Sequence, residues 1–294
     1  MNVTKMNRRA LLAVLGLMNL AAFAPAGPQD PDPPPNGSKY ARRVLSLKPV
    51  GYWRLQEKSG TVAHDSSPHQ RHGTFHGHPG FEKPGPMRGD HAVDFDGKKT
   101  YVEVPSHADF SVPTSKHGMA VEAWMQPDRL DFPGETDQHY VHWLGKGEKD
   151  REEWAFRFYS HTSPDRPNRL SAYIFKPTPG EGAGAFFQDT KFWHPKGEGQ
   201  PWVHVVACYD PGTKNDPKAG VSLYVNGKLR QGPPAKATLY SSFDIVPRAG
   251  DAPLRLGTRD LQSFLHGRMA EVAIYPRVLT AEEVRENYTI ASRE

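Results

Sequence analysis

Apolar and polar side chains alternate in short runs along most of the chain, and clusters of Gly, Pro, Asp and Asn separate the runs. A period of two places successive side chains on opposite faces, so each run predicts a half-buried β-strand. Many short strands of this kind predict two antiparallel sheets packed face to face. The predicted strands are Val50–Leu55, Ala92–Phe95, Tyr101–Val104, Met119–Met125, Tyr140–Leu144, Trp154–Tyr159, Leu170–Phe175, Trp202–Tyr209, Val221–Val225, Leu254–Leu256 and Gly267–Tyr275.

Turn and helix signals complete this pattern. Asp96-Gly97 and Asn226-Gly227 predict tight hairpin turns, because both dipeptides tolerate positive φ angles. Only the C-terminal segment predicts a helix, in which Thr280 caps the first turn and Glu283 completes a capping box. The sequence therefore predicts an all-β chain with one short terminal helix.

The first 26 residues have the composition of a secretory signal peptide. Lys5, Arg8 and Arg9 give a basic start, and the run Ala10–Ala24 is almost entirely apolar. A small-residue cleavage signal then predicts a cut after Ala26. The alternative is an N-terminal membrane anchor, but the apolar run is short for a bilayer span. We therefore expect a secreted or extracytoplasmic protein, with no span in the mature chain and an export route left open.

Net charge and cysteine content argue against some functions and structural features. The formal net charge is +4, and the signal peptide holds three basic residues and no acidic one, which leaves +1 for the mature chain. A charge this small argues against nucleic-acid binding. Cys208 is the only cysteine, so it forms no intramolecular disulfide, and its apolar strand predicts inert core. Residues 27–39 predict a Pro-rich disordered spacer, and 40–294 predict one domain.

Several blocks, in order, resemble bacterial laminin-G-like domains of the concanavalin A-like superfamily. The blocks are Gly51–Leu55 with His64–Ser66, Val93–Gly97 with Tyr101–Val104 as the next hairpin, Val121–Trp124, Trp202–Val206 with Leu223–Gly227, and Gly267–Tyr275 followed by Leu279-Thr280. The resemblance spans about 45–290 and implies a two-sheet antiparallel jelly-roll sandwich. It does not fix the activity, since this scaffold carries lectins, adhesins, glycosidases and lyases.

Two features depart from the simplest family pattern. The closing strand lacks its first acidic residue, so the structural calcium that the resemblance implies has only Asp65 and Glu271 as nameable ligands. Calcium takes six to eight oxygen ligands. The alternative is that Asp65 makes an Asx-turn and Glu271 lies on a solvated face. The second departure is a long additional loop, Lys176–Pro201.

One segment has the carboxylate spacing of concanavalin A-like glucanases. Glu148–Glu152 places carboxylates at alternate positions, which a retaining carboxylate mechanism needs on one strand face. Lys149 and Arg151 stand where those enzymes have apolar residues. We therefore favour a solvated hairpin loop over an active site.

Two pairs of histidines suggest a second kind of site, one that binds a metal ion. His76 with His78, and His139 with His142, could ligate a transition metal. No cysteine accompanies them and no H-E-x-x-H motif is present. Solvated loop histidines remain the favoured interpretation.

The strongest binding signal is an aromatic outer face. In three consecutive strands, the side chains that point away from the core include rings together with Arg and His, which suits sugar stacking and hydroxyl pairing. The predicted ligand-binding residues are Tyr140, His142, Arg157, Tyr159, Tyr173 and Phe175, with Trp193 of the additional loop folding over them. The alternative is that the loop covers this face as a second small core.

The sequence thus favours a non-catalytic carbohydrate-binding or adhesive module whose partner is a glycan or cell-surface polysaccharide. A glycoside hydrolase or polysaccharide lyase on the same scaffold, and a protein-binding structural module, remain alternatives. The oligomeric state and the identity of the glycan stay open.

Overall fold

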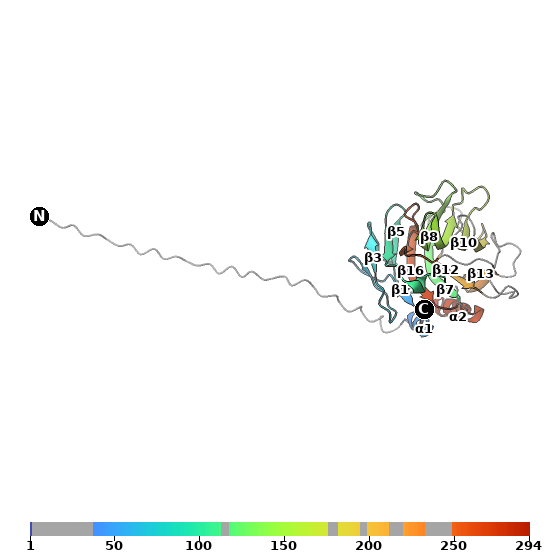
Figure 1. Cartoon of the computed structure of the whole chain (residues 1–294), viewed down its shortest axis with the longest axis horizontal. Helices are drawn as coiled ribbons and strands as arrows, with labels where there is room; N and C mark the ends of the chain where they lie inside the picture. The colour runs from blue at the N-terminus through green and yellow to red at the C-terminus, as the bar shows by residue number, and fades with distance from the viewer. Residues whose placement is uncertain (2–37, 113–117, 176–181, 195–198, 212–219, 233–248) are drawn as a thin grey trace. The chain divides into compact units, whose positions relative to one another are not determined.

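The computed structural model describes Met1 and residues 38–112, 118–175, 182–194, 199–211, 220–232 and 249–294. All of these except Met1 belong to one compact unit, Pro33–Glu294. The predicted signal peptide and nearly all of the predicted spacer lie outside the described residues. Two eight-stranded antiparallel sheets form the unit, so the predicted two-sheet sandwich is confirmed (Figure 1).

The first sheet, here sheet A, has the order β14-β13-β12-β7-β16-β5-β4, with β1 paired to β16. Its strands are β1 (Gly51–Trp53), β4 (Gly80–Pro84), β5 (His91–Asp96), β7 (Met119–Pro127), β12 (Val203–Asp210), β13 (Gly220–Val225), β14 (Lys228–Gln231) and β16 (His266–Tyr275).

The second sheet, here sheet B, has the order β11-β10-β9-β8-β15-β6-β3-β2. Its strands are β2 (Val62–Ala63), β3 (Gly73–His76), β6 (Tyr101–Val104), β8 (Tyr140–Glu148), β9 (Arg151–Tyr159), β10 (Arg169–Phe175), β11 (Gly182–Gln188) and β15 (Leu254–Leu256). Every predicted strand is present, with ends that shift by a few residues.

The additional loop is partly a strand, which corrects the prediction for 176–201. β11 pairs with β10 from Arg169↔Gln188 to Phe175↔Gly182 and forms an edge of sheet B. Gly182 and Gly184 lie so close to β10 that a Cβ atom at either would clash with it. Glycines weaken the alternation of side chains, which hid this strand in the sequence.

The two predicted hairpin turns have different outcomes. Asn226 and Gly227 both have positive φ and connect β13 to β14, as predicted. The turn at Asp96-Gly97 connects two sheets, because β5 pairs with β16 and β6 pairs with β15. The expected β5–β6 hairpin is therefore wrong. Asp96 Oδ1 stabilises this crossing by accepting hydrogen bonds from the backbone N–H groups of residues 98–100.

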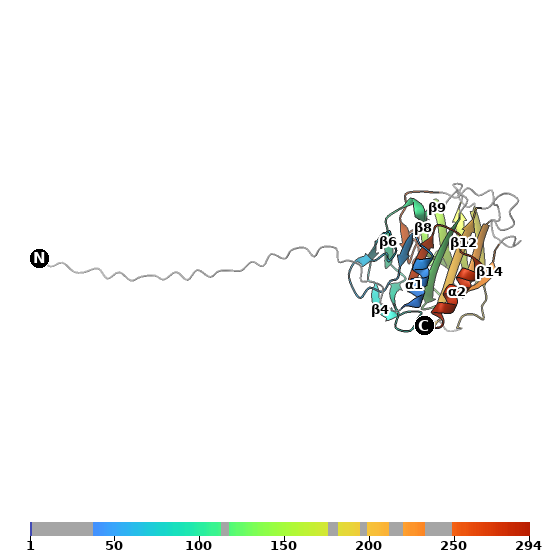
Figure 2. The ribbon, with the colours of Figure 1, turned by 90° about the horizontal axis from the view of Figure 1, so that it is seen from below.

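Two helices cover the outer face of sheet A (Figure 2). α2 (Ala281–Ala291) begins at the predicted Thr280 and Glu283 capping box. α1 (Lys39–Ser46) was not predicted, and it begins one residue before the expected domain boundary. Its amphipathic face packs beside α2 and over sheet A. Among the described residues, no helix is long and apolar enough to cross a membrane.

The main hydrophobic core lies between the sheets. It holds most of the large apolar side chains of the inner strand faces, including Trp53, Phe95, Trp143 and Phe158. A second cluster lies between sheet A and its helices, and a third, much smaller one contains Ala155, Tyr173 and Phe175 on the outer face of sheet B. The sandwich therefore has two unlike outer faces.

Candidate ligand-binding face

The outer face of sheet A is closed around one carboxylate. Glu122 is fully buried and accepts hydrogen bonds from His204 Nε2 at 2.6 Å, Tyr275 Oη at 2.6 Å and Tyr40 Oη at 2.9 Å. Asn287 of α2 donates to both carboxylate oxygens. Burial alone would raise the pKa of Glu122, but these donors together hold it below its ordinary value. This network fastens both helices to the sheet, so this face is structural.

The outer face of sheet B carries rings around an arginine. Arg157 of β9 places its Cζ atom 4.5 Å from the ring centroid of Tyr140, 4.7 Å from that of Tyr173 and 5.6 Å from that of Phe175. Rings at these distances attract a guanidinium group through their negative faces. Tyr159 packs beside Tyr140, with ring centroids 5.2 Å apart.

The directions of these side chains follow the predicted alternation. Their neighbours along the strands lie in the main core, among them Val141, Trp143, Phe156, Phe158 and Ile174. Leu144 is an exception, since a bulge between His142 and Leu144 turns it inward.

The aromatic rings of this face are less exposed to solvent than the sequence led us to expect. Tyr159 is 1% exposed, Tyr173 3%, and Tyr140 and Phe175 9% each. The rings stack on one another and on Arg157, so they bury one another's surfaces. The expectation that the rings of this outer face are exposed to solvent is therefore wrong. The partly exposed member of the predicted set is Arg157, whose guanidinium group lies within a frame of buried rings.

His142 is buried beside Arg157 and is uncharged. Its Nε2 accepts a hydrogen bond from Arg157 Nε at 2.9 Å, and its Nδ1 lies 3.6 Å from Asp260 Oδ2. Burial, together with Arg259 and Arg157, lowers the pKa of His142 to about 3, against the opposing effect of Asp260. The hydrogen-bond pattern assigns the ring proton to Nδ1.

Two further arginines border this face. Arg166 Nη1 donates to Tyr159 Oη at 2.9 Å, and Arg259 lies with its Cζ atom 5.8 Å from the ring centroid of Phe175. Burial raises the pKa of Tyr159, but Arg157 and Arg166 outweigh it and hold that pKa below its usual range. Arg259 and its ion-pair partner Asp260 come from the segment after β15, which the sequence did not connect with this face.

Trp193 does not belong to this face. It is buried in the main core, its ring centroid lies 4.9 Å from that of the inward-pointing Phe158, and its Nε1 donates to the backbone oxygen of Asn168. The prediction that Trp193 folds over the outer rings is wrong, because its ring packs against Phe158 and Phe192 on the inner side of sheet B.

Both carboxylate oxygens of Asp65 accept hydrogen bonds from neighbouring residues of the protein. Its Oδ1 accepts hydrogen bonds from the backbone N–H groups of Tyr52 and Ser67, and its Oδ2 accepts from Ser67 Oγ and the N–H group of Arg71. The Asx-turn alternative for this residue is confirmed.

Glu271 is buried rather than solvated. It forms an ion pair with Arg54 at 2.9 Å and also accepts hydrogen bonds from Tyr52 and Gln56. Hydrogen-bond donors already occupy the oxygens of both carboxylates, and Arg54 lies between Glu271 and the neighbouring Asp90, so these residues do not fit a calcium site. No group of three or more His, Cys, Asp or Glu among the described residues has the arrangement of a metal site.

The charged segment Glu148–Glu152 is the β8–β9 turn, as predicted. Glu148, which is half-buried, pairs with the exposed Arg151 across the turn. The sequence missed the buried ion pair beside it, in which Lys146 Nζ lies 2.5 Å from Glu153 Oε1.

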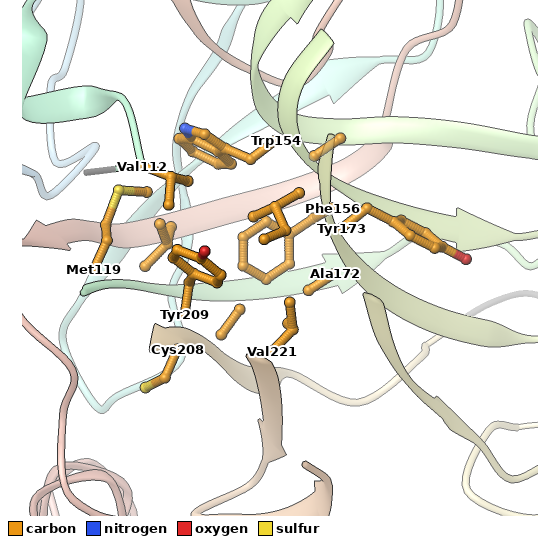
Figure 3. Close-up of a pocket in the computed structure, with 13 residues that line it drawn as sticks. Val112, Met119, Trp154, Phe156, Ala172, Tyr173, Cys208, Tyr209 and Val221 are labelled. Atoms are coloured by element: carbon orange, nitrogen blue, oxygen red, sulfur yellow. The ribbon is translucent and has the colours of Figure 1, made fainter. Parts of the chain in front are cut away.

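A small apolar cavity lies between the sheets, separate from the ring-lined face (Figure 3). Its space of about 30 Å³ is lined by inward-facing side chains such as Met119, Phe156 and Tyr209. Figure 3 shows the ring of Tyr173 on the other side of β10, directed away from this space. A cavity of this size holds about one water molecule and is too small for a sugar.

Binding domains of toxins are among the solved structures that resemble this chain. The chain aligns with the binding domain of Paraclostridial Mosquitocidal Protein 1 at 14% identity and a TM-score of 0.59, covering 83% of this chain and 52% of that one. It also aligns with the ligand binding domain of botulinum neurotoxin serotype D in complex with N-acetylneuraminic acid, at 10% identity and a TM-score of 0.59, covering 85% and 52%. The chain thus spans about half the length of these structures, and the likeness shows the fold.

No curated protein matches the sequence. A family model does match, over residues 96–285, and its description is the concanavalin A-like lectin/glucanases superfamily. The matched segment begins at Asp96, the last residue of β5, and ends within α2, so it contains the three strands β8, β9 and β10 that carry the rings around Arg157. Sequence match, sandwich topology and structural likeness agree: the chain belongs to the concanavalin A-like lectin/glucanases superfamily.

Proposed function

We propose that this protein is a non-catalytic carbohydrate-binding module whose ligand contacts the outer face of sheet B at Arg157. The observation that carries the proposal is Arg157, a partly exposed residue whose guanidinium group lies within a frame of tyrosine and phenylalanine rings. Sugars present hydroxyl groups that accept hydrogen bonds and C–H faces that pack on rings, so this combination suits them. The N-acetylneuraminic acid bound by the neurotoxin serotype D ligand binding domain adds support at the level of the fold.

The hydrolase alternative gains little from the carboxylates near this face. Asp260 pairs with Arg259, and Glu103 and Glu148 both pair with Arg255. Burial raises the pKa of Asp260, but His142 and Arg259 outweigh it and hold the pKa well below its ordinary range. A general acid in a glycosidase needs a raised pKa, so Asp260 is poorly suited to that role.

A glycan array tests the proposal most simply. We expect the full chain to bind at least one glycan, and Tyr140→Ala, at the border of the ring frame, to weaken that binding about tenfold. Tyr288→Ala is the matched control, because Tyr288 is a partly buried ring of α2 that packs on Trp124 of sheet A. Thermal melting establishes that both variants fold. Absence of any glycan ligand, or equal losses in the two variants, would refute the proposal, and capture of a peptide instead would favour the protein-binding alternative.

Export is a separate part of the proposal and rests on the composition of residues 1–26. We expect a chain expressed with this segment to leave the cytoplasm and to begin at Gly27 after processing. N-terminal sequencing of the exported protein tests the cut after Ala26, and retention of the whole chain in the cytoplasm would contradict it.

A further inference from the structure

We infer that the ligand is an anionic sugar whose acidic group pairs with Arg157; this rests on the proposed function and names its ligand class. The first step concerns charge balance on sheet B. Arg255 pairs with Glu103 and Glu148, and Arg259 pairs with Asp260. Arg157 forms no ion pair with any carboxylate within the part of the chain that the structure describes.

The second step concerns how Arg157 stays charged at this position. Burial alone would lower the pKa of Arg157, but tyrosines 140, 159 and 173 raise it above its ordinary value. Its Nε is occupied by His142, and its two terminal nitrogens have no carboxylate partner. Arg157 also shares a side-chain hydrogen bond with Tyr159, and its remaining N–H groups can pair with a carboxylate or a sulfate.

The third step concerns buried polar atoms around Arg157 that lack partners. Ser171 is the cross-strand neighbour of Arg157 on β10, is 1% exposed, and its Oγ has no hydrogen bond. Arg259 is 2% exposed, and its Nε and Nη1 atoms have none either, although Nη1 lies 3.7 Å from Glu152. Both arginines lie against the ring of Phe175. Buried polar atoms normally find partners, so a cluster of them indicates that a ligand supplies some.

The fourth step concerns selectivity. The mature chain carries a net charge of only +1, so attraction of polyanions by bulk charge is weak. Recognition of an acid must then come from local geometry, in which Arg157 lies partly exposed among three rings and without a carboxylate partner in the described part of the chain. The geometry therefore favours an acidic sugar, carrying a carboxylate or a sulfate, over a neutral one.

The test compares acidic and neutral sugars on one array and then by calorimetry. The array carries oligogalacturonate, polysialic acid and dextran sulfate beside neutral galactan and dextran, and calorimetry compares the best acidic ligand with its neutral form, such as the methyl ester. We expect the acid to bind and Arg157→Gln to weaken it about ten- to a hundredfold, the effect of losing a charge-assisted pair. Binding of dextran sulfate that Arg157→Gln abolishes supports the same inference with sulfate as the acidic group.

Two control variants keep the result interpretable. Arg157→Lys retains the charge but lacks the fork, so we expect an intermediate loss of affinity. Arg285→Gln removes an exposed arginine of α2 that pairs with Glu282, and it should leave binding unchanged. Binding of neutral glycans alone, or acid binding that Arg157→Gln leaves intact, would overturn the inference while the proposed function stands. Binding of no glycan at all would remove both.

Discussion

The two outer faces of the sandwich use buried polar groups in opposite ways. On sheet A, Glu122 gathers donors from β12, β16 and both helices, so the protein itself satisfies the carboxylate. On sheet B, Arg157 lies among rings without a carboxylate, and Ser171 and Arg259 keep buried atoms without partners. Among the described residues, Trp124 Nε1 and His204 Nδ1 on sheet A also lack partners, so the contrast lies in the charged groups. Sheet A satisfies its buried carboxylate from within the protein, whereas sheet B, as far as the structure describes it, leaves Arg157 without a carboxylate partner and can take an anionic ligand there.

The largest effect that this comparison predicts is on stability, at the centre of the closed face. Glu122→Leu removes the acceptor for His204, Tyr40, Tyr275 and Asn287, so we expect the free energy of unfolding to fall by about 3–5 kcal/mol in urea denaturation. Glu286→Gln breaks only an exposed pair with Arg43 and should cost no more than about 1 kcal/mol. Equal costs for the two variants would mean that the Glu122 network does not hold the helices.

A second prediction concerns pH at the rim of sheet A. Burial, with the nearby charge of Glu271, raises the pKa of Asp90 to about 7. The folded state therefore holds this proton more tightly than the unfolded state, and its stabilising effect is lost as the pH rises from about 4 through 7. Between pH 5 and 8, we expect wild type to lose about 2 kcal/mol more stability than Asp90→Asn. Parallel pH profiles of the two proteins would contradict this assignment.

On the outer face of sheet B, removal of the central charged group should matter less to the fold. Arg157→Met keeps a long apolar stem but loses the attraction of three rings, so we expect a cost of about 1 kcal/mol in urea denaturation. This cost is well below that of Glu122→Leu. A loss above about 3 kcal/mol would indicate that Arg157 serves the fold, and the contrast between the faces would fail.

The smallest expected effect is on the reactivity of the Cys208 thiol, which lies between sheet A and its helices. Cys208 is buried between sheet A and its helices, and burial raises the pKa of the thiol to about 12. We expect no reaction with a disulfide reagent in the native protein and full reaction after unfolding in guanidinium chloride. Rapid modification of the native protein would mean that the helices leave this face open.

The sequence predicted the sandwich well because alternation is a local signal. Tyr101–Val104 and Leu254–Leu256 match strands β6 and β15 at both ends. The sequence analysis missed helix α1, because eight residues give little helical stability on their own and α1 is stabilised by packing in the second cluster, where Tyr40 contacts Trp124. The sequence analysis also missed strand β11, because its glycines have no side chains that could show the alternating pattern.

The sequence predicted which side chains of the candidate site point outward, but not how much of each is exposed to solvent. The period of two placed Tyr140, Arg157 and Tyr173 on the outer side, which the positions of their neighbours confirm. How tightly the rings pack on Arg157 depends on three-dimensional contacts, and Arg259 comes from a distant segment. The buried Glu122 did leave a local signal, as a charged residue within the apolar run Val121–Trp124, although its partners are remote in sequence.

The measurement that tests the central claim most directly is hydrogen exchange of the full chain with and without its best glycan ligand. The account predicts that bound glycan slows exchange in β8, β9 and β10, around Arg157, and leaves α1, α2 and the strands beneath them unchanged. Protection that falls instead on the helix-covered face of sheet A would contradict the account.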